Sequence, residues 1–177
     1  MKKLILGSFV LSFLLAPVLI NAAEVLFLGP DSFEGWWTQP YYRISSDDIT
    51  INPASNTVSN HDFTAPIHLP EGAKISSMVI FYMDNQSGSK ITAKIVRQNR
   101  YDGSQQTVIS QWSSTDGAAS FRNTKTTNVN YQYNKIVNGA CTYHVQISFV
   151  GIGASSPWDY SNVKLYGVKI FYMPPTT

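Results

Sequence analysis

The sequence lacks several features from which structure or function is commonly deduced. Its single cysteine, Cys141, has no partner within the chain, so stability must come from packing and not from an internal disulfide. No ten-residue stretch after residue 22 combines helical periodicity with capping residues, which excludes a helical domain. No motif fixes a reaction, a ligand or a cofactor, so the sequence alone leaves the specific function open.

The balance of charge excludes one class of partner. The full sequence carries 13 basic and 11 acidic side chains, and two of the basic ones are Lys2 and Lys3. Without the N-terminal segment that contains these two lysines, the counts are 11 and 11 and the chain is formally neutral. A neutral chain gives no reason to expect nucleic acid as a partner.

Residues 1–22 have the pattern of a secretory signal peptide. A start with two lysines precedes an apolar run, Leu4 to Ile20, and small residues follow at Ala22 and Ala23. No stop-transfer pattern follows the run, which favours a cleaved signal over a retained membrane anchor. We expect an exported protein, secreted or periplasmic, in which residues 23–177 form a single domain with no membrane span.

The remainder of the sequence consists of short apolar or alternating segments separated by turn residues, a pattern typical of strands. We expect strands near 23–29, 49–51, 90–98, 107–112, 120–129, 142–150 and 163–173, with two more within 63–84. The pattern predicts an all-β fold, an antiparallel β-sandwich of jelly-roll type, with a long aromatic-rich loop region at residues 29–62.

Three details of the strands are specific enough to test. Residues 63–84 are expected to form a hairpin around the Pro-Glu-Gly turn, with Met78 to Met83 buried on both faces. In the segment 142–150 apolar and polar residues alternate, which predicts one wet face. In the last strand the apolar positions shift parity, and a one-residue bulge near Gly167 would explain the shift.

The part of the chain that follows Phe63 resembles a known group of proteins. This part of the chain contains Pro66, the sequence LPEGAKI from Leu69 to Ile75, Asp84 with Asn85, and the sequence LYGVKIFY near its end. These features resemble a group of secreted bacterial β-sandwich proteins that share an LPxGAxI turn and strand and have no established activity. The resemblance implies the sandwich fold, and it carries no catalytic residue to transfer to this chain.

Aromatic side chains are densest in the loop region and provide the first candidate site. Sugars stack on flat aromatic surfaces through their C–H edges, so these rings could form a platform for carbohydrate. The alternative is that the rings fill the end of the sandwich beneath a loop, as large aromatics commonly do. The candidate ligand-binding residues are Trp36, Trp37, Tyr41, Tyr42, Trp158 and Tyr160.

The polar face of the segment 142–150 provides a second candidate site. His144, Gln146 and Ser148 share this face, and Lys164 and Tyr166 could be neighbours in a groove like that of a jelly-roll lyase or hydrolase. Such an enzyme needs an acid and a base, and no second histidine lies nearby in sequence. A solvated sheet face is the simpler interpretation, so the sequence favours a protein without catalytic activity.

No metal site is predicted. Carboxylates in turns can gather around calcium, but Asp and Asn before Gly or Ser are ordinary turn formers, and no ligand spacing is present. A zinc site at the histidines lacks carboxylate partners in register. The residues considered were Asp47, Asp48, Asp84, Asp102, Asp116, His61 and His68.

The sequence therefore predicts a non-catalytic binding module for carbohydrate or a cell-surface component. Two alternatives stay open: a polysaccharide-active enzyme that uses His144, and a structural or protein-interaction protein of the envelope. The apolar segments 78–83 and 168–173 offer side chains on both faces, which predicts a homo-oligomer formed through an outer sheet face. The alternative is a monomer in which the segment 29–62 folds back over that face.

Overall fold

The computed structural model describes residues 23–35, 42–44, 48–51, 60–85, 89–114, 118–151 and 163–176. Within these residues the chain forms two β-sheets and one turn of 3-10 helix, Pro30–Ser32, and every strand pairing is antiparallel. This architecture confirms the antiparallel β-sandwich. In the described part of the chain no helix is long and apolar enough to cross a membrane.

The six-stranded sheet has the order β3-β4-β11-β6-β9, with β1 paired to β11 as well. Its strands are β1 (Glu24–Leu28), β3 (Tyr42–Ile44), β4 (Ile49–Ile51), β6 (Lys74–Asp84), β9 (Ala118–Thr126) and β11 (Val163–Met173). The five-stranded sheet has the order β2-β5-β10-β7-β8. Its strands are β2 (Glu34–Gly35), β5 (Asn60–Pro66), β7 (Ser89–Asn99), β8 (Gln105–Ser113) and β10 (Cys141–Gly151).

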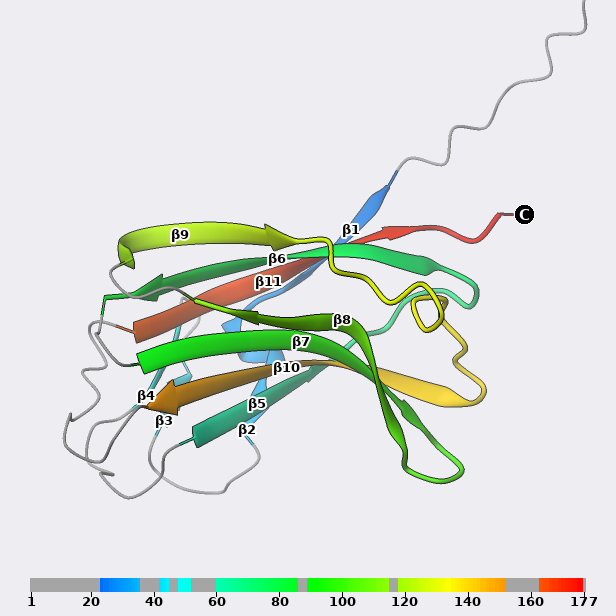
Figure 1. Cartoon of the computed structure of the whole chain (residues 1–177), viewed down its shortest axis with the longest axis horizontal. Helices are drawn as coiled ribbons and strands as arrows, with labels where there is room; N and C mark the ends of the chain where they lie inside the picture. The colour runs from blue at the N-terminus through cyan, green and yellow to red at the C-terminus, as the bar shows by residue number, and fades with distance from the viewer. Residues whose placement is uncertain are drawn as a thin grey trace, which may run out of the picture.

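The two sheets pack face to face around one apolar core (Figure 1). On each strand alternate side chains point inward, because successive residues of a strand face opposite sides of its sheet. Ile80 of β6 and Leu165 of β11 enter the core from the six-stranded sheet, and Val145 and Phe149 of β10 enter it from the five-stranded sheet. Tyr82 and Trp112 join the layers edge to face, with ring centroids 4.9 Å apart.

The expected hairpin between residues 63 and 84 is wrong. Although Gly72 forms the predicted turn, with a φ of 82°, β5 and β6 belong to different sheets. Strand β5 pairs with β10, and β6 pairs with β11 and β9. The Pro-Glu-Gly turn therefore carries the chain from one layer of the sandwich to the other.

Strand β6 is a central strand, but it is not buried on both faces. Met78, Ile80 and Tyr82 are buried in the core, whereas Val79, Phe81 and Met83 lie on the outer face and are only half-buried. A two-layer sandwich has one interior, and among the described residues no third layer covers this face. The apolar run from Met78 to Met83 therefore supplies the core and the outer surface in alternation.

The predicted bulge in the last strand is confirmed. The register between β11 and β6 shifts between Leu165 and Gly167, and Gly167 has a φ of 139°. Leu165 and Val168 both point into the core in consequence. Glycine is required because this backbone conformation is closed to residues that carry a Cβ.

Candidate functional site

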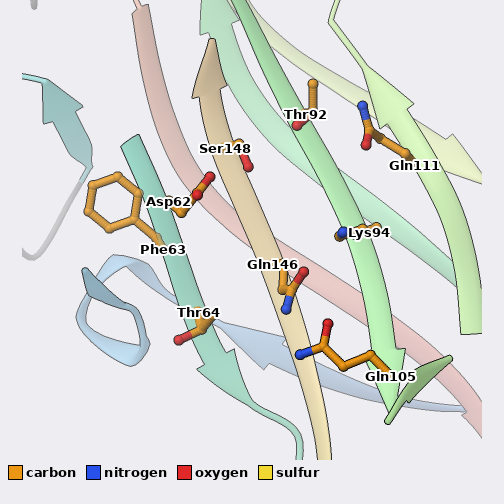
Figure 2. Close-up of a pocket in the computed structure, with 9 residues that line it drawn as sticks. All are labelled: Asp62, Phe63, Thr64, Thr92, Lys94, Gln105, Gln111, Gln146 and Ser148. Carbon is orange, nitrogen blue, oxygen red and sulfur yellow. The ribbon is translucent and has the colours of Figure 1, made fainter. Parts of the chain in front are cut away.

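A shallow cleft crosses the outer face of the five-stranded sheet, with a volume of about 160 Å³. Its walls come from strands β5, β10, β7 and β8, as Figure 2 shows. We call it the polar cleft, and its lining residues are Asp62, Phe63, Thr64, Thr92, Lys94, Gln105, Gln111, Gln146 and Ser148. Seven of these side chains, those other than Phe63 and Thr92, are polar groups at half-buried or exposed positions.

The register of the sheet explains why these side chains meet. Gln146 of β10 lies opposite Thr64 of β5 on one side and opposite Lys94 of β7 on the other. Ser148 lies in the same way between Asp62 and Thr92. Side chains directly opposite each other in antiparallel strands are about 5 Å apart, so the polar cleft is floored by two parallel rows of polar groups.

The polar cleft combines hydrogen-bond donors and acceptors with balanced charge. Glutamine amides and hydroxyls both donate and accept, the carboxylate of Asp62 accepts, and the ammonium group of Lys94 donates. One acid and one base among the lining residues leave no net charge. Such a surface suits a neutral ligand with many hydroxyl groups, held by hydrogen bonds from a rigid sheet.

His144 lies on the same outer face, between Pro66 and Val96 of the neighbouring strands. Its Nε2 atom is 3.1 Å from the hydroxyl of Thr142. Burial lowers the pKa of His144, and the nearby charge of His68 lowers it further. No carboxylate pairs with His144 among the described residues.

The grouping of Lys164 and Tyr166 with His144 is wrong. Both belong to β11 of the six-stranded sheet, whereas His144 and Gln146 belong to β10 of the five-stranded sheet. The Nζ atom of Lys164 forms an ion pair with Asp48 at 2.9 Å. Sequence parity shows which residues of a strand share a face, but it does not show which sheet the strand joins.

Most of the expected aromatic platform lies outside the described residues. This holds for Trp36, Trp37, Tyr41, Trp158 and Tyr160. Tyr42 begins β3 at the edge of the six-stranded sheet, and only its backbone is described. At the other end of the segment, Gly35 pairs with Phe63 of β5, so the chain enters this aromatic segment from the polar cleft's own sheet.

Sequence reasoning found Gln146 and Ser148 but missed the other walls of the polar cleft. Lys94 and Thr92 alternate with apolar residues along β7 in the same way as Gln146 and Ser148 along β10. This alternation predicts a half-buried strand at 90–98, but it does not place Thr92 and Lys94 in a site. The pairing of β10 with β5 and β7, which brings Asp62 and Lys94 together, has no local signal.

The described acidic residues considered for metal binding have other roles. No group of three or more His, Cys, Asp or Glu side chains suited to a metal occurs in the described part of the chain. Asp84 is fully buried and accepts a hydrogen bond from Ser114. Asp102 accepts the backbone N–H of Ser104 at 2.8 Å in a turn, and hydrogen bonds from Ser104 lower its pKa. Asp47, Asp116 and the side chain of His61 lie outside what is described.

Comparison with known proteins identifies likeness of fold. No protein-family model and no curated protein matches the sequence. Among solved structures, a xylan-binding module, CBM15, is 13% identical with a TM-score of 0.50, over 88% of this chain and 100% of that chain. An isomalto-dextranase from Arthrobacter globiformis T6, complexed with panose, is 13% identical with a TM-score of 0.42, and the match covers 85% of this chain but 23% of the enzyme. The structure of infectious bursal disease virus, Gx strain, is 14% identical with a TM-score of 0.41, over 86% of this chain and 33% of that chain.

Proposed function

We propose that the protein is a non-catalytic carbohydrate-binding module and that the polar cleft holds the sugar chain. The observation that carries the proposal is the pair of polar rows across β5, β10 and β7, with Gln105 and Gln111 of β8 along the side. Each amide or hydroxyl there can exchange hydrogen bonds with a sugar hydroxyl. The strands fix the backbone positions of these residues before the ligand arrives, which limits the entropic cost of binding.

The fold supports the choice of carbohydrate among hydroxyl-rich ligands. The xylan-binding module, whose whole length is matched by 88% of this chain, binds a carbohydrate. Export, which residues 1–22 predict, would bring such a module into contact with polysaccharides of the envelope or the surroundings. The localisation, secreted or periplasmic, is part of this proposal.

Trp36 and Trp37 complete the proposal as stacking residues. They follow Gly35 directly in the sequence, and Gly35 is paired with Phe63 beside the polar cleft. Hydrogen bonds from the cleft and stacking on indole rings would then act on the same ligand, the first giving orientation and the second giving apolar contact.

Catalysis receives less support than binding from the described residues. His144 stands between two apolar neighbours, Pro66 and Val96, and its single described side-chain partner is Thr142. A hydrolase or lyase would need a proton donor opposite this base. The hydrogen-bonding groups of the polar cleft support binding instead.

The test is calorimetric titration of the purified protein with soluble xylan, mixed-linkage glucan, galactan and dextran. Gln146→Ala and Gln111→Ala each remove an amide from the polar cleft, and we expect about a fivefold to tenfold weaker affinity for each. Gln132→Ala is the matched control, because Gln132 is exposed in a turn and does not line the polar cleft. Binding of none of the four polymers, or an equal loss in the control, would reject the cleft as the site.

Two further variants separate the parts of the proposal. Trp36→Ala and Trp37→Ala should each weaken the same interaction by about 1 kcal/mol, the contribution of one stacked ring. The thermal midpoint of each variant is measured as well, and an unchanged midpoint assigns the loss to binding and not to folding. Release of reducing sugar from any of these polymers, abolished by His144→Ala, would show an enzyme and contradict the non-catalytic assignment. Binding that survives every cleft variant would move the site elsewhere.

A further inference from the structure

The outer face of the six-stranded sheet carries a continuous cluster of aromatic rings. Phe27 and Phe81 meet edge to face with centroids 6.2 Å apart, and Phe81 stacks on Phe121 at 5.9 Å. Phe121 is in turn 5.3 Å from Tyr166. These four rings come from β1, β6, β9 and β11, and we call them the aromatic strip.

Gly167 lies directly beneath the ring of Phe27 in the aromatic strip. A Cβ at this position would lie 2.9 Å from Cζ of Phe27 and 2.7 Å from the carbonyl oxygen of Leu28. The ring of Phe27 therefore lies directly over bare backbone, next to Phe81, which is the register partner of Gly167. The bulge and the missing side chain let the rings of β1 and β6 meet across β11.

The aromatic strip is open to solvent. Phe27 is 52% exposed and Phe121 is 53% exposed, and Val25, on the same face of β1 as Phe27, is 49% exposed. Large apolar side chains that gather at one exposed place mark a binding surface more often than single ones do. No described segment of the chain forms a layer above them.

Lysines accompany the rings. The ammonium group of Lys169 lies 5.4 Å from the ring centroid of Phe81, and that of Lys125 lies 5.4 Å from the ring centroid of Phe171. Lys169 and Lys125 are the register partners of Val79 on its two sides, so they stand in one row across the sheet. Neither forms an ion pair with an acidic side chain in the described part of the chain.

Two more lysines face each other at one end of the same sheet. Lys74 and Lys135 are opposite residues of an isolated antiparallel bridge. The amides of Ile75 and Ile136 donate to the carbonyls of Asn134 and Ala73, so Lys74 and Lys135 form a non-hydrogen-bonded pair, in which side chains approach most closely. Like charges directly opposite each other destabilise a sheet.

A hollow of about 270 Å³ adjoins this lysine pair. Met173, Pro174 and Pro175 form its apolar wall, and Met173 is the register partner of Lys74 on β11. Two ammonium groups beside an apolar wall suit a ligand that carries both an anionic group and an apolar face. An anion between the two lysines would also relieve their repulsion.

Acidic side chains around this face already have partners. Asp48 pairs with Lys164 at 2.9 Å, and Glu24 accepts the hydroxyl of Tyr172 at 2.5 Å. Glu71 accepts the backbone N–H of Asn138 at 2.6 Å. Only Asp48 is neutralised by an ion pair, and Glu24 and Glu71 keep their negative charge. The four lysines of the face outnumber these two acids, whereas the polar cleft on the other sheet has balanced charge.

We propose that this face is a second binding surface, specific for an acidic polysaccharide whose sugars carry carboxylate groups. The aromatic strip would contact the apolar C–H faces of the sugars, and the lysines would pair with the carboxylates. Lys74 is five residues from Val79 along β6, a span of roughly 17 Å, so the charges are spread for a polymer and not gathered for a single anion.

This proposal goes beyond the proposed function, since it concerns the opposite sheet and a ligand of different charge. A second copy of the chain suits the face less well. Symmetric packing would place the lysines of one copy against the lysines of the other, and their like charges would repel. A polyanion would be attracted to the same lysines.

The test is affinity electrophoresis in gels that contain polygalacturonate, with neutral dextran gels as reference. Lys74→Gln with Lys135→Gln, and separately Lys125→Gln with Lys169→Gln, should each weaken binding about tenfold. The matched control is Lys90→Gln with Arg100→Gln, which removes the same charge from exposed positions of β7 and the turn that follows it. Added salt should weaken binding of the unchanged protein by screening the ion pairs.

Phe121→Ala tests the aromatic part, because it leaves the charge unchanged and should weaken binding at high salt as well as low salt. Each variant is first checked for an unchanged thermal midpoint. Loss in the charge control equal to that in the lysine variants would reduce the effect to net charge and overturn the proposal. Failure to bind polygalacturonate, or binding to vesicles of anionic phospholipid in its place, would also overturn it, as would a stable dimer whose interface is broken by Phe121→Ala.

The two proposals can fail separately. Gln146→Ala in the polar cleft should leave retardation by polygalacturonate unchanged, and the lysine variants should leave titration with neutral polysaccharides unchanged. If one variant changed both, a single surface would have to account for both ligands, and the second surface would be rejected.

Discussion

Ser114 donates a hydrogen bond from its hydroxyl to the carboxylate of Asp84, and this bond joins the two sheets at one end of the sandwich. Asp84 ends β6 of the six-stranded sheet, and Ser114 directly follows β8 of the five-stranded sheet. Both side chains are buried, and the same hydroxyl accepts the backbone N–H of Ile91 at 2.9 Å. A buried carboxylate is tolerated only where such donors reach it.

Ser114→Ala should lower the free energy of unfolding by about 1–3 kcal/mol, because it removes a donor from Asp84 and an acceptor from Ile91 at once. Urea denaturation followed by tryptophan fluorescence measures the change. Ser113→Ala is the control, since Ser113 is exposed at the end of β8. Equal effects of the two substitutions would show that the link between the sheets contributes little.

Gly167→Ala should be destabilising by about 2 kcal/mol or more, because alanine disfavours the backbone conformation of the bulge and its Cβ would meet Leu28 and Phe27. Gly139→Ala is the matched control, since a Cβ there meets nothing within 4 Å. Thermal unfolding of both variants compares them. A stable Gly167→Ala protein would show that β1 can move away from β11 at little cost.

Stability should fall as the pH drops below the ordinary histidine pKa of about 6.5, in part because of His144. Burial, and then the charge of His68, lower the pKa of His144 in the folded protein, so the unfolded chain binds more protons in this range. His144→Gln should make the loss of stability between neutral and mildly acid pH less steep. Parallel pH profiles of the two proteins would contradict this role.

Tyr143→Phe should lower the free energy of unfolding by about 1–3 kcal/mol, since the buried hydroxyl donates to the carbonyl of Lys135 and accepts the N–H of Val137, both at 3.0 Å. Burial raises the pKa of Tyr143, so the folded protein holds this proton longer than the unfolded chain, and stability is lost as the pH rises past the ordinary tyrosine value of 10.0. The variant should lose less stability there. Tyr131→Phe, at an 81% exposed position, serves as control.

Cys141 should react with a thiol reagent such as Ellman's reagent only after unfolding. Its side chain is free of any disulfide and only 7% exposed, and reaction requires access to the thiolate. One thiol per chain should therefore react with the reagent in denaturant, and almost none should react in buffer. Rapid reaction of the folded protein would show that the end of β10 opens.

The sequence predicted the strands well because their signals are local. The limits of β11 and the bulge at Gly167 follow from the spacing of apolar residues in that strand alone. The outward row of Gln146 and Ser148 follows from alternation in the same way. Each of these features depends on residues a few positions apart, whose periodicity the sequence displays directly.

Pairing between strands was not predictable, because its causes lie far apart in the chain. The turn at Gly72 looked like that of a hairpin, yet β5 finds its partner in β10 and β6 finds its partner in β11. The site depends on these distant pairings: Asp62 and Lys94 reach the polar cleft only through β10. The aromatic strip was missed for the same reason, since Phe27 and Phe121 meet Phe81 only through β11 and β9.

The position of the last two strands in the sandwich has a consequence for how the chain acquires its structure. Strand β10 lies between β5 and β7, and β11 lies between β6 and the strands β4 and β1. Among the described strands, a nascent chain that ends before residue 141 can form four separate pairs, β2 with β5, β7 with β8, β3 with β4 and β6 with β9. The five-stranded layer cannot close until β10 is made, and the six-stranded layer cannot close until β11 is made. The two layers should therefore condense around their common core only after both strands have been synthesised.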